Sequence, residues 1–300
     1  MAAHLTRRRV IIATSIVAGL CILVVAIVLG SQLYRNSPGQ RITRAMTSIS
    51  QTDAQIAVVD DAISAQLSTE TTAQVALARR AIPVAQRTLN DARAQLDALP
   101  DSAARKPATA TRLARIHRCL DARLVLLAAA PPLLDETSQA ATALACSAPA
   151  WQNLQDAAAL TTAAEQEFAR QTQDAMVSSH ESSTQAADAY AQAQDQFNAA
   201  AQAYPATDFK DYIAYTQQRI LMTQSALLGC EDWINGHYQD ANTDVTAYNG
   251  FAQAAARIAG AGLQLPSDLV ASTYQTQTKT AQLTYDNARA EVLRADAALR

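Results

Sequence analysis

The chain has 300 residues, a net charge of −3 at pH 7, 8 glycines, 4 cysteines and 4 histidines. So few cysteines exclude a disulfide-dense secreted scaffold, and four histidines leave little material for a metal or nucleophile centre. Strong helix formers dominate the composition, and no glycine occurs between Gly39 and Gly229. A β-rich or loop-rich chain needs glycine in its turns. We therefore expect an all-α fold.

The N-terminus predicts a membrane anchor. Arg7–Arg9 lead directly into residues 10–30, which carry no charge and reach ~30 Å as a helix, the thickness of a bilayer core. Because Lys and Arg resist translocation, we expect a cytoplasmic tail at 1–9 and a single-pass transmembrane signal-anchor helix at 10–30 in the cell membrane. The remainder, including a juxtamembrane linker at 31–40, should be extracytoplasmic.

Three processing signals compete with an uncleaved anchor. Arg7–Arg9 also resembles a twin-arginine export signal, and Val28–Gly30 resembles a signal-peptidase site. The segment before Cys21 resembles a lipoprotein box, although Leu20 is larger than such boxes accept. The apolar stretch exceeds the usual 7–15 residues of a cleaved signal. We favour the uncleaved anchor.

Three stretches place mostly apolar residues at alternating steps of three and four, which aligns them along one helix face. Each stripe should lie buried in a seam between helices. The seams are Val75, Ala78, Ile82, Ala85, Leu89, Ala92, Leu96 and Leu99; Ala186, Tyr190, Ala193, Phe197, Ala200 and Tyr204; and Ala271, Tyr274, Thr278, Ala281, Tyr285, Ala288, Val292, Ala295 and Leu299. They predict an elongated antiparallel helical bundle of the coiled-coil type.

Proline and the rare glycines indicate where helices should end. We expect helices at about 38–98, 103–145, 150–203, 207–260 and 266–299. Of these, 103–145 should be kinked or turned at Pro131–Pro132, and 207–260 should break near Gly236. Pro83 should kink the first helix or mark its start. Residues 178–185 interrupt the apolar seam and should form a flexible joint.

The helix-ending residues repeat with an offset near 105, for example Pro100 and Pro205. An internal duplication would explain this spacing, giving two tandem three-helix units that share a long helix. We place the membrane-proximal bundle at 41–178 and the distal bundle at 179–300. Residues 41–130 hold 12 basic and 8 acidic groups, whereas 131–300 hold 8 basic and 19 acidic groups. The basic part could contact anionic headgroups, and the acidic part could face partners.

No catalytic, cofactor or metal residues are assigned from the sequence. It lacks a glycine-rich phosphate loop, a Ser/His/Asp arrangement and a cluster with metal-ligand spacing. The basic run lacks the aromatic neighbours that stack bases, so nucleic acid is not an expected partner. Trp233 should be buried at a helical turn, or it could form an interaction surface with Tyr212, Tyr215 and His237.

The cysteines allow two interpretations. A helical turn at Pro131–Pro132 would bring Cys119 and Cys146 level and permit a disulfide. One kinked helix would instead hold them ~40 Å apart, with all outer thiols packed in helix seams as small hydrophobes. We favour free thiols, with Cys230 unpaired in both cases.

Together these features predict a membrane-anchored helical bundle that acts as a structural or interaction component of the cell envelope. It is not expected to be an enzyme. Its partners would be the lipid bilayer, through residues 10–30, and another envelope or membrane protein. The alternative is a ligand-binding or sensor-type ectodomain that works with a partner membrane protein, because about nine cytoplasmic residues leave no room for an output domain.

Overall fold

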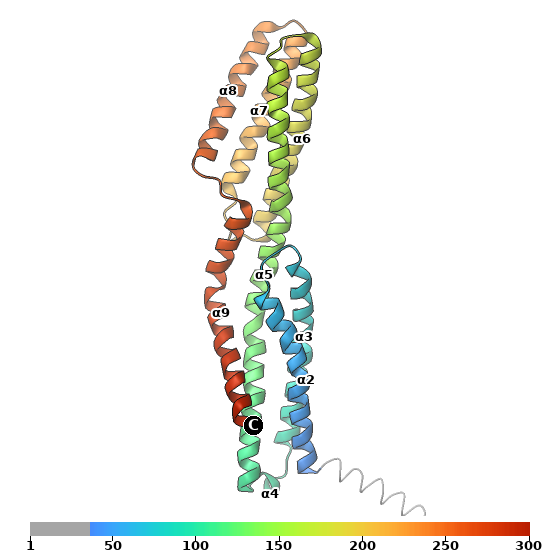
Figure 1. The fold of residues 1–300 in the computed structure, drawn as a ribbon, viewed down its shortest axis with the longest axis vertical. Coiled ribbons are helices and arrows are strands. Elements are labelled where there is room, and N and C mark those ends of the chain that lie inside the picture. Colours follow the sequence, from blue (N-terminus) through green and yellow to red (C-terminus); the bar gives the residue numbers. More distant parts are fainter. Residues whose placement is uncertain (1–36) are drawn as a thin grey trace, which may run out of the picture. The chain divides into compact units, whose positions relative to one another are not determined.

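The computed structural model describes residues 37–300, which form helices and, within that range, no strand (Figure 1). The helices are α2 (Pro38–Ser64), α3 (Thr71–Asp97), α4 (Asp101–Ala104), α5 (Pro107–Phe168), α6 (Gln173–Ala203), α7 (Lys210–Ile234), α8 (Tyr238–Gly260) and α9 (Pro266–Leu299). The predicted all-α bundle is confirmed.

The predicted cytoplasmic tail 1–9, the predicted anchor 10–30 and residues 31–36 of the predicted linker lie outside the described residues. Within residues 37–300, none of the helices combines the length and the apolar character needed to cross a bilayer.

Two compact units make up the described chain. Unit 1 contains residues 37–57, 80–128 and 285–300, and unit 2 contains residues 58–79 and 129–284. Helices α2, α3, α5 and α9 each contribute residues to both units. Each unit is therefore a bundle assembled from segments that are far apart in the sequence.

Unit 1 combines a core of aliphatic side chains with one buried charge. Ile116, Leu120 and Leu126 of α5 are fully buried. Arg123 of the same helix is only 2% exposed, and its guanidinium donates hydrogen bonds to Asp53 of α2 and Asp296 of α9. The three helices are thus joined by both apolar packing and a buried ion-pair cluster.

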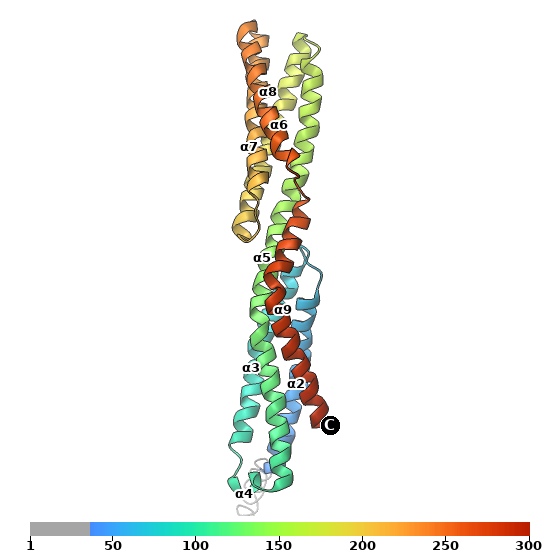
Figure 2. The same ribbon diagram turned by 90° about the vertical axis from the view of Figure 1, so that its left-hand side faces the viewer.

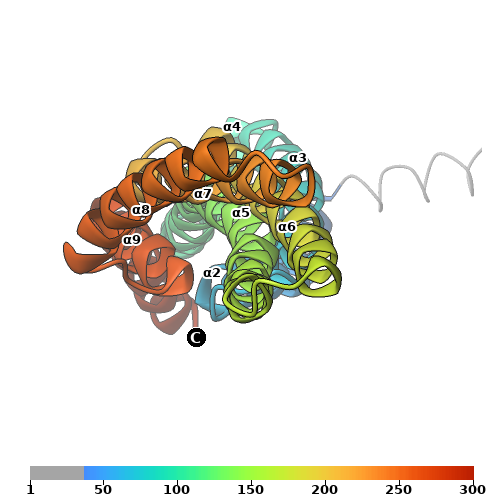
Figure 3. The same ribbon diagram turned by 90° about the horizontal axis from the view of Figure 1, so that it is seen from above.

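Unit 2 contains the aromatic core of the chain. Helix α7 packs against both α6 and α8. Helices α7 and α8 run side by side in Figure 2, and Figure 3 shows the same ribbon from above. The rings of Phe197, Phe209 and Tyr212 lie with centroids 5.1–6.2 Å apart. Trp151 meets Tyr212 edge-on at 6.4 Å. Such aromatic contacts add to the stabilisation from area burial alone.

The three predicted seams are confirmed. Every residue of the first two seams is buried, including Leu89 and Tyr190 at 0% exposure. In the third seam Thr278, Tyr285 and Val292 are buried and the other members are buried or half-buried. The three-and-four spacing therefore identified the faces that pack.

Two helix breaks were missed. The helix expected at 38–98 ends at Ser64, and α3 begins at Thr71, whose Oγ1 accepts a hydrogen bond from the Ser68 N–H at 2.9 Å. The helix expected at 150–203 is interrupted at residues 169–172. There Gln171 has a φ of 52° and Thr172 caps α6 by accepting from the Ala175 N–H.

The opposite error occurred at 146–149, where a break between two helices was expected, and of the two outcomes expected at Pro131–Pro132 the turn is not formed. Helix α5 continues from Pro107 to Phe168 through these prolines and through Pro149. Both Pro131 and Pro132 lie on the exposed face, whereas Leu133 and Leu134 are fully buried. Burial of the opposite face therefore outweighs the lost backbone hydrogen bonds. The break near Gly236 and the helix at 266–299 are confirmed, and α3 runs through Pro83.

Candidate functional site

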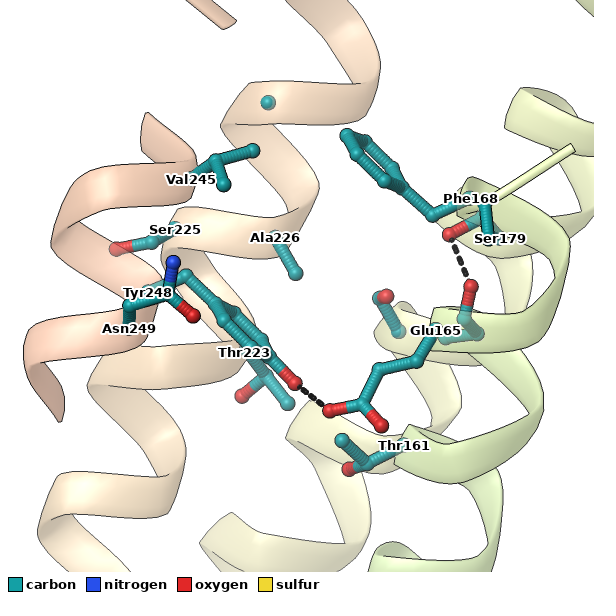
Figure 4. A pocket seen from close by; sticks show the side chains of 14 residues that line it. Thr161, Glu165, Phe168, Ser179, Thr223, Ser225, Ala226, Val245, Tyr248 and Asn249 are labelled. Atoms are coloured by element: carbon teal, nitrogen blue, oxygen red, sulfur yellow. Dashed lines mark hydrogen bonds between the residues drawn. The ribbon is translucent and has the colours of Figure 1, made fainter. Parts of the chain in front are cut away.

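Unit 2 contains a cavity of about 290 Å³ among helices α5, α6, α7 and α8 (Figure 4). Helix α5 contributes Thr161, Glu165 and Phe168, which lie on one helix face because they are four and three residues apart. Helix α6 contributes Ser179 and Ser183, again four residues apart. The site is thus built from helix faces, not from loops.

Small side chains explain why space remains between these helices. Ala164, Ala226 and Gly229 line the cavity where a bundle would normally place larger apolar residues. Ser179 and Ser183 occupy buried α6 positions. Short side chains on facing helices leave a gap that the aromatic ring of Phe168 only partly fills, as Figure 4 shows.

A hydrogen-bonded chain of polar groups extends from one end of the cavity wall. The Arg219 Nε–H and Nη2–H donate to the Tyr190 hydroxyl at 2.8 and 2.6 Å. The Thr161 hydroxyl donates to the Ala157 carbonyl at 2.8 Å, so the Tyr190 hydroxyl donates to Thr161 Oγ1, 3.3 Å away. Burial raises the pKa of Tyr190, although Arg219 partly offsets it. The phenol therefore stays protonated and completes the chain.

Tyr248 of α8 reaches across the cavity to Glu165 of α5, and its hydroxyl donates to the Glu165 carboxylate (Figure 4). Burial, and then this hydrogen bond, raise the pKa of Tyr248. The phenol stays protonated, so Glu165 acts as the acceptor. The contact links two helices whose residues are 83 positions apart in the chain.

Cys230 lies behind the cavity wall. Its Sγ is 3.5 Å from the Ser179 Oγ, and the Ser179 hydroxyl donates to the Ala164 carbonyl at 2.9 Å. Burial raises the pKa of the Cys230 thiol, and its hydrogen bond with Ser179 only partly opposes this. A protonated, fully buried thiol is a packing group and not a nucleophile.

The predicted interaction residues Tyr212 and Tyr215 lie elsewhere in unit 2. Tyr212 is 3% exposed, belongs to the aromatic core, and donates its hydroxyl hydrogen to the Gln264 carbonyl. Tyr215 is half-buried against the same core. Neither residue lines the unit 2 cavity.

Trp233 lies near the other end of α7, ~27 Å along the helix from Tyr215, and His237 follows the end of α7. The Trp233 ring is half-buried and meets Tyr238 edge-on at 5.7 Å. His237 is exposed, with its Nδ1 3.5 Å from the Asp232 carboxylate. The structure therefore does not bring the four predicted residues together.

Cys119 and Cys146 both lie on α5 and are free thiols in the structure, as is Cys230. The helical turn that would bring Cys119 and Cys146 level is not formed, because α5 continues through Pro131–Pro132. Along one helix the two residues are separated by about seven turns.

The cavity residues were missed by the sequence analysis. Glu165 and Tyr248 become neighbours only when α5 and α8 pack, and no local pattern reports that. Ser179 and Ser183 did carry a signal, because they continue the α6 seam spacing of Ala186 and Tyr190.

Comparisons with protein families, curated proteins and solved structures found no match to this chain.

Proposed function

We propose that the chain is a membrane-anchored extracytoplasmic helical bundle that serves as a structural or interaction component of the cell envelope. The proposal rests on the order of its parts. An arginine cluster, an apolar stretch at 10–30 and then a helical bundle follow one another with little linking chain. Because α2 begins at Pro38, seven residues separate α2 from the apolar stretch at 10–30. Seven residues can span at most ~25 Å.

The observation that best supports this arrangement is the cationic surface at the start of unit 1. Arg41 and Arg44 lie on the first turns of α2 and line one groove together with Asp91. Arg112 and Arg115 of α5 line a neighbouring groove, and the Arg112 Nη2 lies 3.2 Å from the Met46 sulfur. Near an anionic leaflet each such basic group contributes about 1 kcal/mol of attraction. This end of unit 1 is therefore suited to lie against headgroups.

Topology is tested with protease added to intact, wall-stripped cells. The large domain should be digested, leaving an N-terminal fragment of a few kilodaltons, on the order of the mass of the anchor. Full protection of the domain would refute the proposal, and a mature N-terminus at Ser31 would replace the anchor with a cleaved signal. Crosslinking in intact membranes followed by purification should then recover another envelope protein.

The finer architecture is also a proposal: two tandem bundles that share a long helix and form an elongated molecule. A shared long helix is supported by α5, which contributes residues to both units, as α2, α3 and α9 also do. The range 150–203, where the shared helix was expected, is instead divided between α5 and α6. Small-angle scattering on residues 40–300 should give a radius of gyration well above the ~18 Å of a compact chain of that length. A radius near the compact value would refute it.

A ligand-binding ectodomain that works with a partner membrane protein is the second candidate. The cavity of unit 2 is the observation that favours it. The two candidates are compatible, because a scaffold can also carry a binding site.

A further inference from the structure

We propose that the unit 2 cavity binds a small organic ammonium ion with an apolar body. The inference rests on the ligand-binding candidate and specifies its ligand. It requires only the fold of unit 2, and neither the membrane anchor nor a partner protein.

Hydrogen-bond acceptors outnumber donors among the side chains that face the cavity. The hydroxyl hydrogens of Thr161, Ser179, Thr223 and Ser225 are all donated to helix backbone carbonyls. The Tyr248 hydroxyl hydrogen is donated to Glu165. The oxygens of these groups still offer lone pairs, whereas the Ser183 hydroxyl and the Asn249 amide, which also line the cavity, can donate as well as accept. Counted over all these groups, acceptors outnumber donors. The complementary ligand is a donor.

The cavity lining carries a negative charge. Glu165 is the charged side chain among the residues that line the cavity. It is exposed to solvent, and the hydrogen bond that its carboxylate accepts within the described chain comes from the Tyr248 hydroxyl. Arg219 is connected to the site through Tyr190, but it does not line the cavity. Its guanidinium is directed to the Tyr190 hydroxyl and packs over that ring, 5.2 Å from the centroid. A carboxylate in a wall of acceptors favours a cationic donor.

Apolar side chains in the cavity suit the rest of the ligand. Phe168 and Val245 project into the cavity from opposite sides in Figure 4, with Ala226 between them. These groups provide apolar contact for a hydrocarbon or aromatic body, and the Phe168 and Tyr248 rings can also face a cation. At about 290 Å³ the cavity lies at the small end of ligand sites, which span ~300–1,000 Å³. A ligand with one ring or a short alkyl chain fits this size.

The test uses the full-length chain in phosphatidylcholine nanodiscs and three probes of similar shape. These are 2-phenylethylammonium, neutral 2-phenylethanol and anionic phenylacetate. Isothermal titration calorimetry, with empty nanodiscs subtracted, measures each affinity. The ammonium probe should bind about three- to fivefold more tightly than the alcohol, because Glu165 is exposed and solvent screens its charge. Equal affinities, tighter binding of phenylacetate or no binding of any probe would overturn the proposal.

Matched variants locate the site. Glu165→Gln should remove the preference for the ammonium probe while leaving the affinity for the alcohol within about twofold. Glu167→Gln is the control, because Glu167 also lies on α5 but pairs with Arg170 and does not line the cavity. It should keep the preference. An equal loss in both variants would show general attraction to an acidic surface and refute a site at Glu165.

Two further variants guard against misfolding. Tyr248→Phe keeps the carboxylate and should retain the preference, and loss of the preference would contradict the role of Glu165. Ala226→Phe should fill the cavity and abolish binding of all probes while far-UV circular dichroism stays unchanged. Retained binding in that variant would place the ligand elsewhere. Because the anchor is not involved, a failed topology test leaves these outcomes unaffected, and failed binding leaves the topology unaffected.

Discussion

Replacing Arg123 by Met should destabilise unit 1 more than replacing any of its exposed charges. Arg123 is 2% exposed. Its Nη1 and Nη2 donate to the two Asp296 oxygens at 2.7 and 3.0 Å, and its Nε and Nη2 donate to Asp53 at 3.2 and 2.8 Å. Burial lowers its pKa, but the hydrogen bonds to Asp296 and Asp53 outweigh this and raise it. The guanidinium is therefore charged throughout the usual pH range.

The magnitude follows from how exposed the two carboxylates are. Asp53 is 56% exposed and is rehydrated when Arg123 is lost, so that pair contributes as a surface pair, about 1 kcal/mol or less. Asp296 is 30% exposed and forms two charged hydrogen bonds, which contribute about 1.5–3 kcal/mol. Met keeps the apolar stem and removes the cost of desolvating a guanidinium. The net loss should be about 2–3 kcal/mol in the free energy of unfolding.

Urea unfolding followed by far-UV circular dichroism measures this loss, and Arg118→Met is the matched control. Arg118 also joins α5 to α9, through Glu291 at 2.7 and 3.0 Å, but it is 56% exposed. Its replacement should cost about 1 kcal/mol or less. Equal losses for the two variants would refute the assignment of the buried cluster as the stabilising one. Adding Asp296→Leu to Arg123→Met should recover part of the loss, because it removes the unpaired carboxylate.

Three further predictions concern other contacts. Tyr190→Phe should destabilise unit 2 by about 1–3 kcal/mol in tryptophan-monitored unfolding, because Arg219 loses its acceptor, whereas Tyr215→Phe should cost under about 0.5 kcal/mol. Thiol counting on residues 40–300, denatured and unreduced, should find three free thiols, and a count of one would indicate a disulfide. Hydrogen bonds from Arg118 and then Arg294 lower the pKa of Glu291 below 4.5, so its contribution is present above pH 4.5 and is lost as the pH falls through the lowered value. Between pH 4.5 and the lowered pKa of Glu291, the urea midpoint of unfolding should therefore fall less for Glu291→Gln than for the wild type.

The helical seams could be predicted because their cause is local and periodic. A residue such as Leu89 or Phe197 occupies a fixed angular position on its helix, so the three-and-four spacing identifies the buried face without knowledge of the partner helix. The same argument located α9, where Pro266 begins the helix and provides a local start signal.

Helix ends were less predictable because tertiary packing decides which local signals take effect. Prolines 131 and 132 point to solvent while the opposite face is buried, so the helix persists despite the missing donors. Conversely, the breaks at 65–70 and 169–172 contain neither glycine nor proline. Their signals are two threonines: Thr71, whose Oγ1 accepts from the preceding Ser68 N–H, and Thr172, which caps α6. Threonine is common enough elsewhere in the chain to carry little weight alone.

The polar segment at 178–185 shows how the candidate site was misinterpreted. Read as an interruption of the α6 seam, it predicted a flexible joint, but the segment lies within α6. Met176, Ser179, Ser183 and Ala186 continue the alternating steps of three and four, and all are buried. A serine at such a position keeps the helix register while filling less volume than leucine and presenting an oxygen to the interior. Two serines in succession along a seam therefore indicate a cavity with a polar wall, and this cavity is the one that Glu165 faces.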